Sequence, residues 1–255
     1  MPKLSSHPIV DLLENNTISP SKKFREGFLK NIQNGDFESS VRLSLNKEED
    51  YHWNVSIEIN KLVASFRRIQ IIIDFLSIPL EDIPSTDEKL SGLIWLTYHY
   101  SSFIWTIVSV VDITLILTSV IFNLGISPKH CRIGLILDHE FVSEKVKKAL
   151  KNLNTEVNRY RESRNLILHR GDSPDMEGAS KLAVLEALTD MKPDVFQSET
   201  ESHYQNVCES LSTDINKKGE VLENLVSELF DALKPSYEKE YGNIRGDLLQ
   251  KALSK

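Results

Sequence analysis

A cation, an amide and an imidazole occur within six residues of this chain, in the sequence Arg164-Asn165-Leu166-Ile167-Leu168-His169. An arginine guanidinium presents a planar fork of N–H donors that matches the oxygens of a phosphate group. A histidine imidazole can accept or release a proton near neutral pH. Phosphate binding together with proton transfer is the chemistry that cleavage of a phosphodiester needs. The hexapeptide is therefore the first candidate for a functional site.

The hexapeptide lies at the end of a long predicted helix that begins near Asp138 or Ser143. An apolar stripe follows this helix in steps of three and four residues and comprises Val142, Val146, Ala149, Leu153, Val157 and Tyr160. The next steps of the stripe fall on Arg164 and Ile167, so Arg164 is expected on the inward face. Because an interior guanidinium needs an anionic or polar partner, we expect the end of this helix to line a cleft. Asp112 is one candidate partner.

The spacing within the hexapeptide limits how one helix can use it. Arg164 and His169 lie about 140° apart around a helix with 3.6 residues per turn. Asn165 and His169 are four residues apart and nearly aligned. One helix therefore cannot point Arg164 and His169 at a single atom, whereas two facing copies could grip one phosphodiester. This geometry favours a homodimer with a composite site.

Charge is concentrated around the hexapeptide. Residues 129–170 contain ten Lys or Arg and five Asp or Glu, a net charge of +5, while the whole chain carries −7. The overall negative charge argues against a protein that coats nucleic acid uniformly. A local basic region suits a selective phosphate site, with Arg161 and Arg170 as further substrate-binding residues. The alternative interpretation is a solvated helix of mixed charge.

Composition excludes several other classes. The chain has 255 residues, of which 40% are hydrophobic and 26% charged, and its ten glycines and nine prolines favour helices over a turn-rich β fold. Two cysteines, Cys131 and Cys208, provide no disulfide framework, and the first residues lack the apolar run of a signal peptide, so a cytoplasmic setting is expected. His130 and Cys131 are adjacent without a second ligand pair, so neither a metal nor another cofactor is expected.

One apolar segment, residues 103–122, is long enough to span a membrane and carries a single charge, Asp112. A carboxylate at the bilayer midplane costs about 2.5–3.5 kcal/mol on insertion scales. The polar residues of this region also follow one helical stripe, from His99 to Asn123. We therefore expect a core helix of a soluble protein and no membrane partner.

Periodicity and stop signals predict a mostly helical chain. The expected helices cover about residues 8–15, 22–33, 57–78, 87–124, 138–170, 175–191, 204–233 and 236–253. Alternating residues at 41–45 and 51–59 predict a small hairpin across residues 46–50. Pro79 and Pro235 mark expected breaks between helices.

The motif Arg164-Asn165-x-x-x-His169 resembles the Arg-x4-6-His signature of the HEPN superfamily (higher eukaryotes and prokaryotes nucleotide-binding domain), including its frequent Asn after the Arg. The sequence from Tyr160 to Gly171 is similar to the RN-x-x-x-H-R-G form of several prokaryotic branches. A long apolar helix before the charged motif helix also fits. The likeness covers residues 90–175, is weaker over 55–89 and 176–255, and does not extend to 1–54.

The resemblance implies an all-α antiparallel bundle, with residues 1–54 as an accessory segment and residues 55–255 as the HEPN-like domain (core 87–191). It also implies a metal-independent endoribonuclease of toxin–antitoxin, abortive-infection or other defence systems, which dimerises with facing motifs and has RNA and an antitoxin or operon partner as partners. Arg164 would polarise the scissile phosphate, Asn165 would orient the site, and His169 would act as acid or base. Some family toxins carry a regulatory Tyr two residues after the His, where this chain has Gly171.

Each residue also has a structural interpretation. His169 could stabilise the dipole at the end of its helix. Arg164 could form an internal ion pair with Asp112, which would be compatible with a supporting role for Asp112 in catalysis. The alternative function is a non-catalytic HEPN-like module that binds nucleotides or a partner protein through the same cleft.

Overall fold

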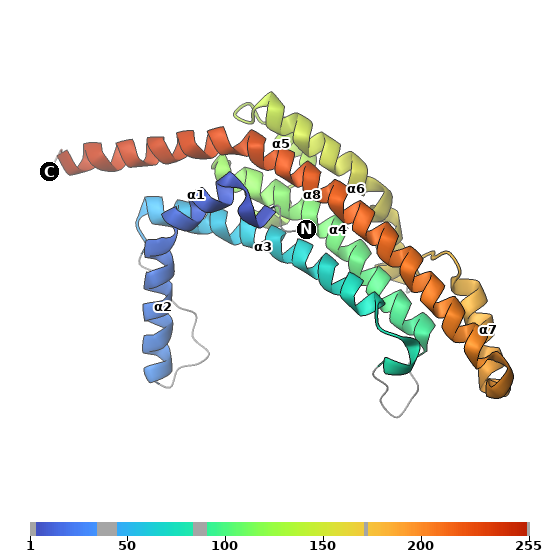
Figure 1. Cartoon of the computed structure of the whole chain (residues 1–255). Helices are drawn as coiled ribbons and strands as arrows, with labels where there is room; N and C mark the ends of the chain where they lie inside the picture. The colour runs from blue at the N-terminus through green and yellow to red at the C-terminus, as the bar shows by residue number, and fades with distance from the viewer. Residues whose placement is uncertain (1–3, 35–44, 84–90, 171–172, 254–255) are drawn as a thin grey trace. The chain divides into compact units, whose positions relative to one another are not determined.

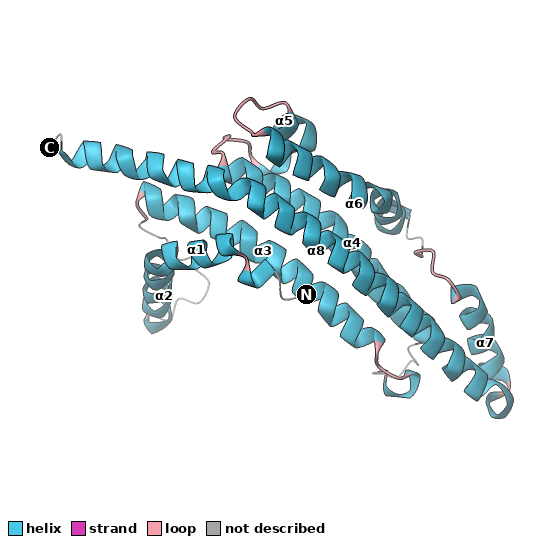
Figure 2. Cartoon of the chain, turned by 45° about the horizontal axis from the view of Figure 1, so that its top comes forward, coloured by secondary structure: helices cyan, strands magenta, loops and turns pink. Residues whose placement is uncertain are grey.

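The computed structural model describes residues 4–34, 45–83, 91–170 and 173–253, with side chains to residue 244, and every regular element in these ranges is a helix (Figures 1 and 2). The α-helices are α1 (Pro8–Asn16), α2 (Ile18–Gln33), α3 (Lys47–Leu76), α4 (Gly92–Ile121), α5 (Ile133–Leu137), α6 (Glu144–Arg170), α7 (Ala179–Met191) and α8 (Pro193–Leu253). Short 3-10 turns cover Leu4–Ser6, Leu80–Asp82 and Pro128–His130. The predicted all-α class is confirmed.

The chain forms two compact units, which we call unit 1 and unit 2. Unit 1 comprises residues 64–111 and 153–224, and unit 2 comprises residues 2–63, 112–152 and 225–255. Four helices, α3, α4, α6 and α8, therefore contribute one segment to each unit. The predicted domain boundary at residue 54 falls within α3, and a separate role for residues 1–54 stays a prediction.

Unit 1 is a helical bundle held by apolar packing and by polar contacts between helices. Its core includes Phe66, Leu96, Phe103, Val157, Leu185 and Ile215, all 5% exposed or less. Trp95 Nε1 of α4 donates a hydrogen bond to the carbonyl of Phe75 in α3 at 3.2 Å. The hydroxyls of Thr189 in α7 and Thr200 in α8 lie 2.6 Å apart and hydrogen bond. These contacts connect four of its helical segments.

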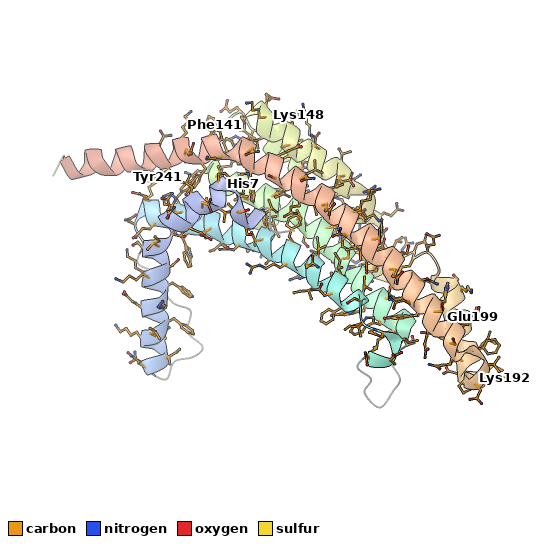
Figure 3. The ribbon with its side chains drawn as sticks, viewed as in Figure 1. His7, Phe141, Lys148, Lys192, Glu199 and Tyr241 are labelled. Carbon is orange, nitrogen blue, oxygen red and sulfur yellow. The ribbon has the colours of Figure 1, made fainter. Side chains whose placement is uncertain are left out.

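Unit 2 is organised around the buried hydroxyl of Tyr237 in α8. This hydroxyl lies 2.6 Å from His52 Nδ1 of α3 and accepts a hydrogen bond from Asn16 Nδ2 of α1 at 3.1 Å. The Tyr51 hydroxyl donates to the carbonyl of Ile121 in α4 at 3.0 Å. His7, just before α1, packs against α8, and Figure 3 labels it. The amino-terminal helices thus join the bundle through α8 and α3.

The predicted hairpin is wrong for its second strand, because residues 51–59 lie within α3. Tyr51, Val55, Ile59 and Leu62 are all buried, at the spacings of four, four and three residues that one helix face requires. Their helical period outweighs the loose alternation that suggested a strand. Most of the first strand, residues 41–44, lies outside the described residues.

The predicted break at Pro235 is also wrong, because α8 continues through it from Pro193 to Leu253. A proline inside a helix removes one backbone hydrogen bond and usually kinks the helix. On either side of it, Leu233 and Tyr237 are fully buried. We infer that their packing outweighs the lost bond. The helix that precedes α8 begins at Ala179 rather than at residue 175, because Gly178 has a left-handed φ of 83°.

The α4 helix is long and apolar enough to cross a membrane by composition. In this structure 67% of its most apolar window is buried inside the protein, as in a core helix. The absence of a membrane partner stays a prediction.

Candidate functional site: the end of α6

The α6 helix carries the candidate residues on a well-packed support. Its apolar stripe is confirmed as a core face, since every predicted member from Val142 to Tyr160 is 8% exposed or less. The amide of Val146 donates a hydrogen bond to Ser143 Oγ at 3.4 Å, which satisfies a free donor at the helix start. The helix continues to Arg170, so the entire hexapeptide is helical.

Arg164 is half-buried rather than enclosed, because the core stripe reaches the last turns of the helix there. Its Nε and Nη2 both donate to the side-chain oxygen of Asn165, at 3.3 and 3.0 Å. The neighbouring amide thus supplies a polar partner that the spacing argument required. Two donors on one oxygen also fix the direction of the guanidinium plane.

Asp112, the candidate for an internal ion pair with Arg164, is an exposed residue of α4 in unit 2. Burial raises the pKa of the nearby Cys131 thiol, and the charge of Asp112 raises it further. A supporting role of Asp112 in catalysis stays a prediction.

A shallow groove of about 540 Å³ runs along the outer face of the last turns of α6, and we call it the α6 groove. Arg161, Asn165, His169 and Arg170 line it together with Asn158, Glu162 and Leu166. Four of the five residues proposed from the hexapeptide and its flanks therefore share one surface. Arg164 lies outside this lining and is connected to it through Asn165, as the angular argument predicts.

The groove is open to solvent and mainly cationic. His169 and Arg170 are exposed in the final turn of α6. The partial negative charge at a helix carboxyl end favours a cation such as Arg170 there. Arg161 is half-buried, and its Nη2 donates to Asn154 Oδ1 at 3.3 Å, which holds its stem along the helix. Glu162 is the one acidic side chain among the lining residues.

Lys218, which no sequence motif indicated, contacts α6 at Tyr160. Lys218 of α8 places its Nζ 5.5 Å from the ring centroid of Tyr160, and Arg159 places its guanidinium 5.0 Å from the same ring. Burial raises the pKa of Tyr160, against the effect of these two cations. No sequence signal near residue 160 could reveal Lys218, because it approaches from another helix.

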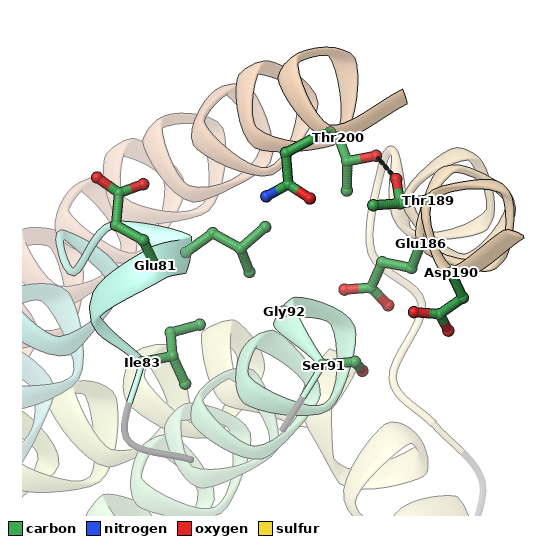
Figure 4. Close-up of a pocket in the computed structure, with 10 residues that line it drawn as sticks. Glu81, Ile83, Ser91, Gly92, Glu186, Thr189, Asp190 and Thr200 are labelled. Carbon is green, nitrogen blue, oxygen red and sulfur yellow. Dashed lines mark hydrogen bonds between the residues drawn. The ribbon is translucent and has the colours of Figure 1, made fainter. Parts of the chain in front are cut away.

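Unit 1 contains a second cavity, of about 310 Å³, at the start of α4 (Figure 4). Glu81, Glu186 and Asp190 are among its lining residues. Glu186 Oε1 accepts a hydrogen bond from the backbone N–H of Leu93 at 3.1 Å, so this carboxylate caps the first turn of α4. Burial raises the pKa of Glu186, while hydrogen bonds from the start of α4 oppose the rise. Three carboxyl groups make this cavity unsuitable for a phosphate, whereas the charged side chains of the α6 groove are mainly cationic.

Comparison with known proteins agrees with the family resemblance and the fold. The family model described as Cthe2314-like HEPN matches residues 60–234, which include the hexapeptide and most of the bundle. No curated protein and no solved structure matches the chain. The match covers more than half of the chain, and the structure is an all-helical bundle. The chain therefore belongs to the HEPN superfamily of nucleotide- and RNA-related helical modules.

Proposed function

We propose that this protein is a metal-independent endoribonuclease whose reaction takes place at the α6 groove. The supporting observation is the grouping of Arg164, Asn165 and His169 at the accessible end of one rigid helix, with Arg161 and Arg170 beside them. Arg161 and Arg170 line the groove with His169, and Arg164 lies beside it. These cations would concentrate a polyanion and stabilise negative charge on its phosphate.

The proposed reaction uses the RNA's own 2′-hydroxyl as nucleophile. Its proton passes to a histidine, its oxygen forms a bond to phosphorus, and the bond to the 5′-oxygen breaks after that oxygen receives a proton. The products are a 2′,3′-cyclic phosphate and a free 5′-hydroxyl. His169 is the residue proposed to transfer protons, and Arg164 the residue proposed to hold the phosphate oxygens.

The reaction needs one proton acceptor and one proton donor, whereas the α6 groove contains a single histidine. A second copy of the chain, with its groove facing the first, would provide the other imidazole and a second arginine. We therefore propose a homodimer with a composite site. Because the α6 groove is open along its outer face, a strand of RNA could enter between two such copies.

The direct test is incubation of purified protein with a single-stranded RNA, followed by chemical analysis of the new ends. Wild-type protein should yield 2′,3′-cyclic phosphate and 5′-hydroxyl ends, also in the presence of a chelator. His169→Ala and Arg164→Ala should lower the cleavage rate by about a hundredfold or more. The matched control is Lys151→Ala, which removes an exposed cation two turns before the groove begins. Equal rates for wild-type protein and both site variants would contradict the proposal.

A non-catalytic binding module is the second candidate, and Glu162 is the observation that favours it. This carboxylate lines the same groove and would repel a phosphate close to His169, so it favours a partner protein with a basic side chain as the occupant. Binding of RNA or nucleotide without any new RNA ends would establish this candidate instead.

For the biological setting we propose a cytoplasmic toxin or defence ribonuclease, controlled by an antitoxin or operon partner. Expression of the wild-type chain should then arrest bacterial growth, while His169→Ala at equal protein level should not. If both chains arrest growth equally, toxicity has another origin.

A further inference from the structure

The α2 helix presents an apolar face that the described residues of unit 2 leave uncovered. Pro20 is the only residue of α2 that is buried, and side chains project along the whole helix (Figure 3). The exposed fractions are 66% for Ile18, 41% for Phe24, 48% for Phe28 and 49% for Leu29. Large apolar side chains grouped on a surface in this way usually mark a binding site.

Aromatic rings form a row on this surface. The rings of Phe24 and Phe28 have centroids 6.4 Å apart and planes only 5° from parallel. Trp53 of α3 continues the row, with its ring centroid 5.7 Å from that of Phe24. Both rings are more than 40% exposed, so each offers a flat apolar surface on which a nucleotide base can stack.

The charge of α2 is opposite to that of the chain as a whole. The helix has Lys22, Lys23, Arg25 and Lys30 against Glu26, a net charge of +3, while the chain carries −7. Lys23 is paired with Glu49 of α3, at 2.6 Å between Nζ and Oε2, and this contact together with hydrogen bonds from Asn46 and Ser19 lowers the pKa of Glu49 to about 2. The other three cations are exposed. An anionic partner would complement this helix.

The position of Arg25 argues against a bilayer as that partner. Arg25 is three residues from Phe28 and four from Leu29, so it lies among the apolar side chains rather than on the opposite face. An amphipathic helix that enters a membrane keeps its cations on the polar face. Flat rings interleaved with cations are instead the combination that binds unpaired nucleotides, through stacking and phosphate contacts.

We propose that α2, with Trp53, is a second nucleic-acid contact that binds single-stranded RNA by stacking bases on Phe24 and Phe28. This surface belongs to unit 2 and is distinct from the α6 groove in unit 1. The binding requires no cleavage. A role in presenting RNA for cleavage rests on the proposed function, whereas the binding does not.

The test uses the full-length chain with His169→Ala, so that RNA stays intact, and a fluorescent single-stranded oligoadenylate as probe. Phe28→Ala in this background should weaken binding about tenfold, because stacking contributes about 1–3 kcal/mol per base. Phe28→Trp should retain the affinity. Leu29→Ala is the matched control, since Leu29 is as exposed as Phe28 on the same helix but has no ring, and it should change the affinity less than twofold.

The competing partners give different results in the same experiment. If α2 instead docks on protein or lipid, Phe28→Ala and Leu29→Ala will leave RNA affinity unchanged. With protein as the partner, the two variants will lower self-association in light scattering by similar amounts. With lipid as the partner, they will lower co-sedimentation with anionic phosphatidylglycerol vesicles by similar amounts. That result overturns the inference while leaving the α6 proposal intact. Loss of binding in Phe28→Ala, together with absence of cleavage by wild-type protein, supports the inference and refutes the ribonuclease.

Discussion

The contact between Arg164 and Asn165 predicts that Asn165 orients the Arg164 guanidinium, so that the two residues act together on a phosphate. Asn165 Oδ1 accepts from Nε and Nη2 of the guanidinium, at 3.3 and 3.0 Å, which leaves the remaining donors of Arg164 to face a phosphate. A buried hydrogen bond to a charged group contributes about 1.5–3 kcal/mol. Because this pair is exposed, we expect about 1 kcal/mol. Asn165→Ala should therefore slow RNA cleavage about fivefold by misdirecting Arg164.

The assay is a double-mutant cycle on the single-turnover rate of cleavage of a short RNA. Arg164→Ala alone should slow cleavage about a hundredfold or more. Adding Asn165→Ala to it should cause no further loss, because the group that Asn165 positions is already absent. The matched control is Asn158→Ala, which removes another amide from the same groove and should combine additively with Arg164→Ala. If Asn165→Ala costs the same factor with and without Arg164, the positioning role is refuted.

Two further predictions concern stability. Burial lowers the pKa of His52 from 6.5 to about 4. Below pH 6.5 the unfolded chain therefore binds more protons than the folded chain. As a result, the free energy of unfolding should fall by up to about 3 kcal/mol between pH 6.5 and 4. Urea unfolding should show a flatter pH dependence for His52→Phe, and an unchanged slope would contradict this. A Cβ at Gly92 would lie 2.7 Å from Tyr204 Cδ2 and 2.8 Å from Leu80 Cδ1, so Gly92→Ala should lower the free energy of unfolding by about 1–3 kcal/mol. Gly134→Ala, with nothing within 4 Å of its Cβ, is the control, and an equal loss in both variants would refute the steric explanation.

Much of the helical architecture could be predicted because burial follows the sequence period. The stripe from Val142 to Tyr160 repeats in steps of three and four, and α6 buries that face. Pro8 occupies the first position of α1, where its missing N–H costs little. Tertiary packing decided the cases that local signals did not, such as residues 51–59 and Pro235.

The candidate site was predictable only as far as one helix determines it. Helix angles place Asn165 and His169 on one face with Arg161, and the α6 groove contains all three. The hydrogen-bond partner of Arg164 could not be predicted from the sequence. Side-chain direction decides whether the guanidinium contacts Asp112 or the amide of Asn165. Lys218 lies nearly sixty residues after Tyr160 in the sequence, so its contact with that ring could be found only from the three-dimensional structure.

The most direct test of the composite site is the distance between two copies of the α6 groove in solution. Leu168 is 50% exposed and lies between Arg164 and His169 around the helix, so a spin label at Leu168→Cys reports their position. The background is Cys131→Ser, with Cys208 buried. Electron paramagnetic resonance should show one short inter-subunit distance between the labels. The distribution of that distance should narrow when non-cleavable RNA binds. A monomer, or a dimer whose labels lie a full protein diameter apart with and without RNA, would contradict the account.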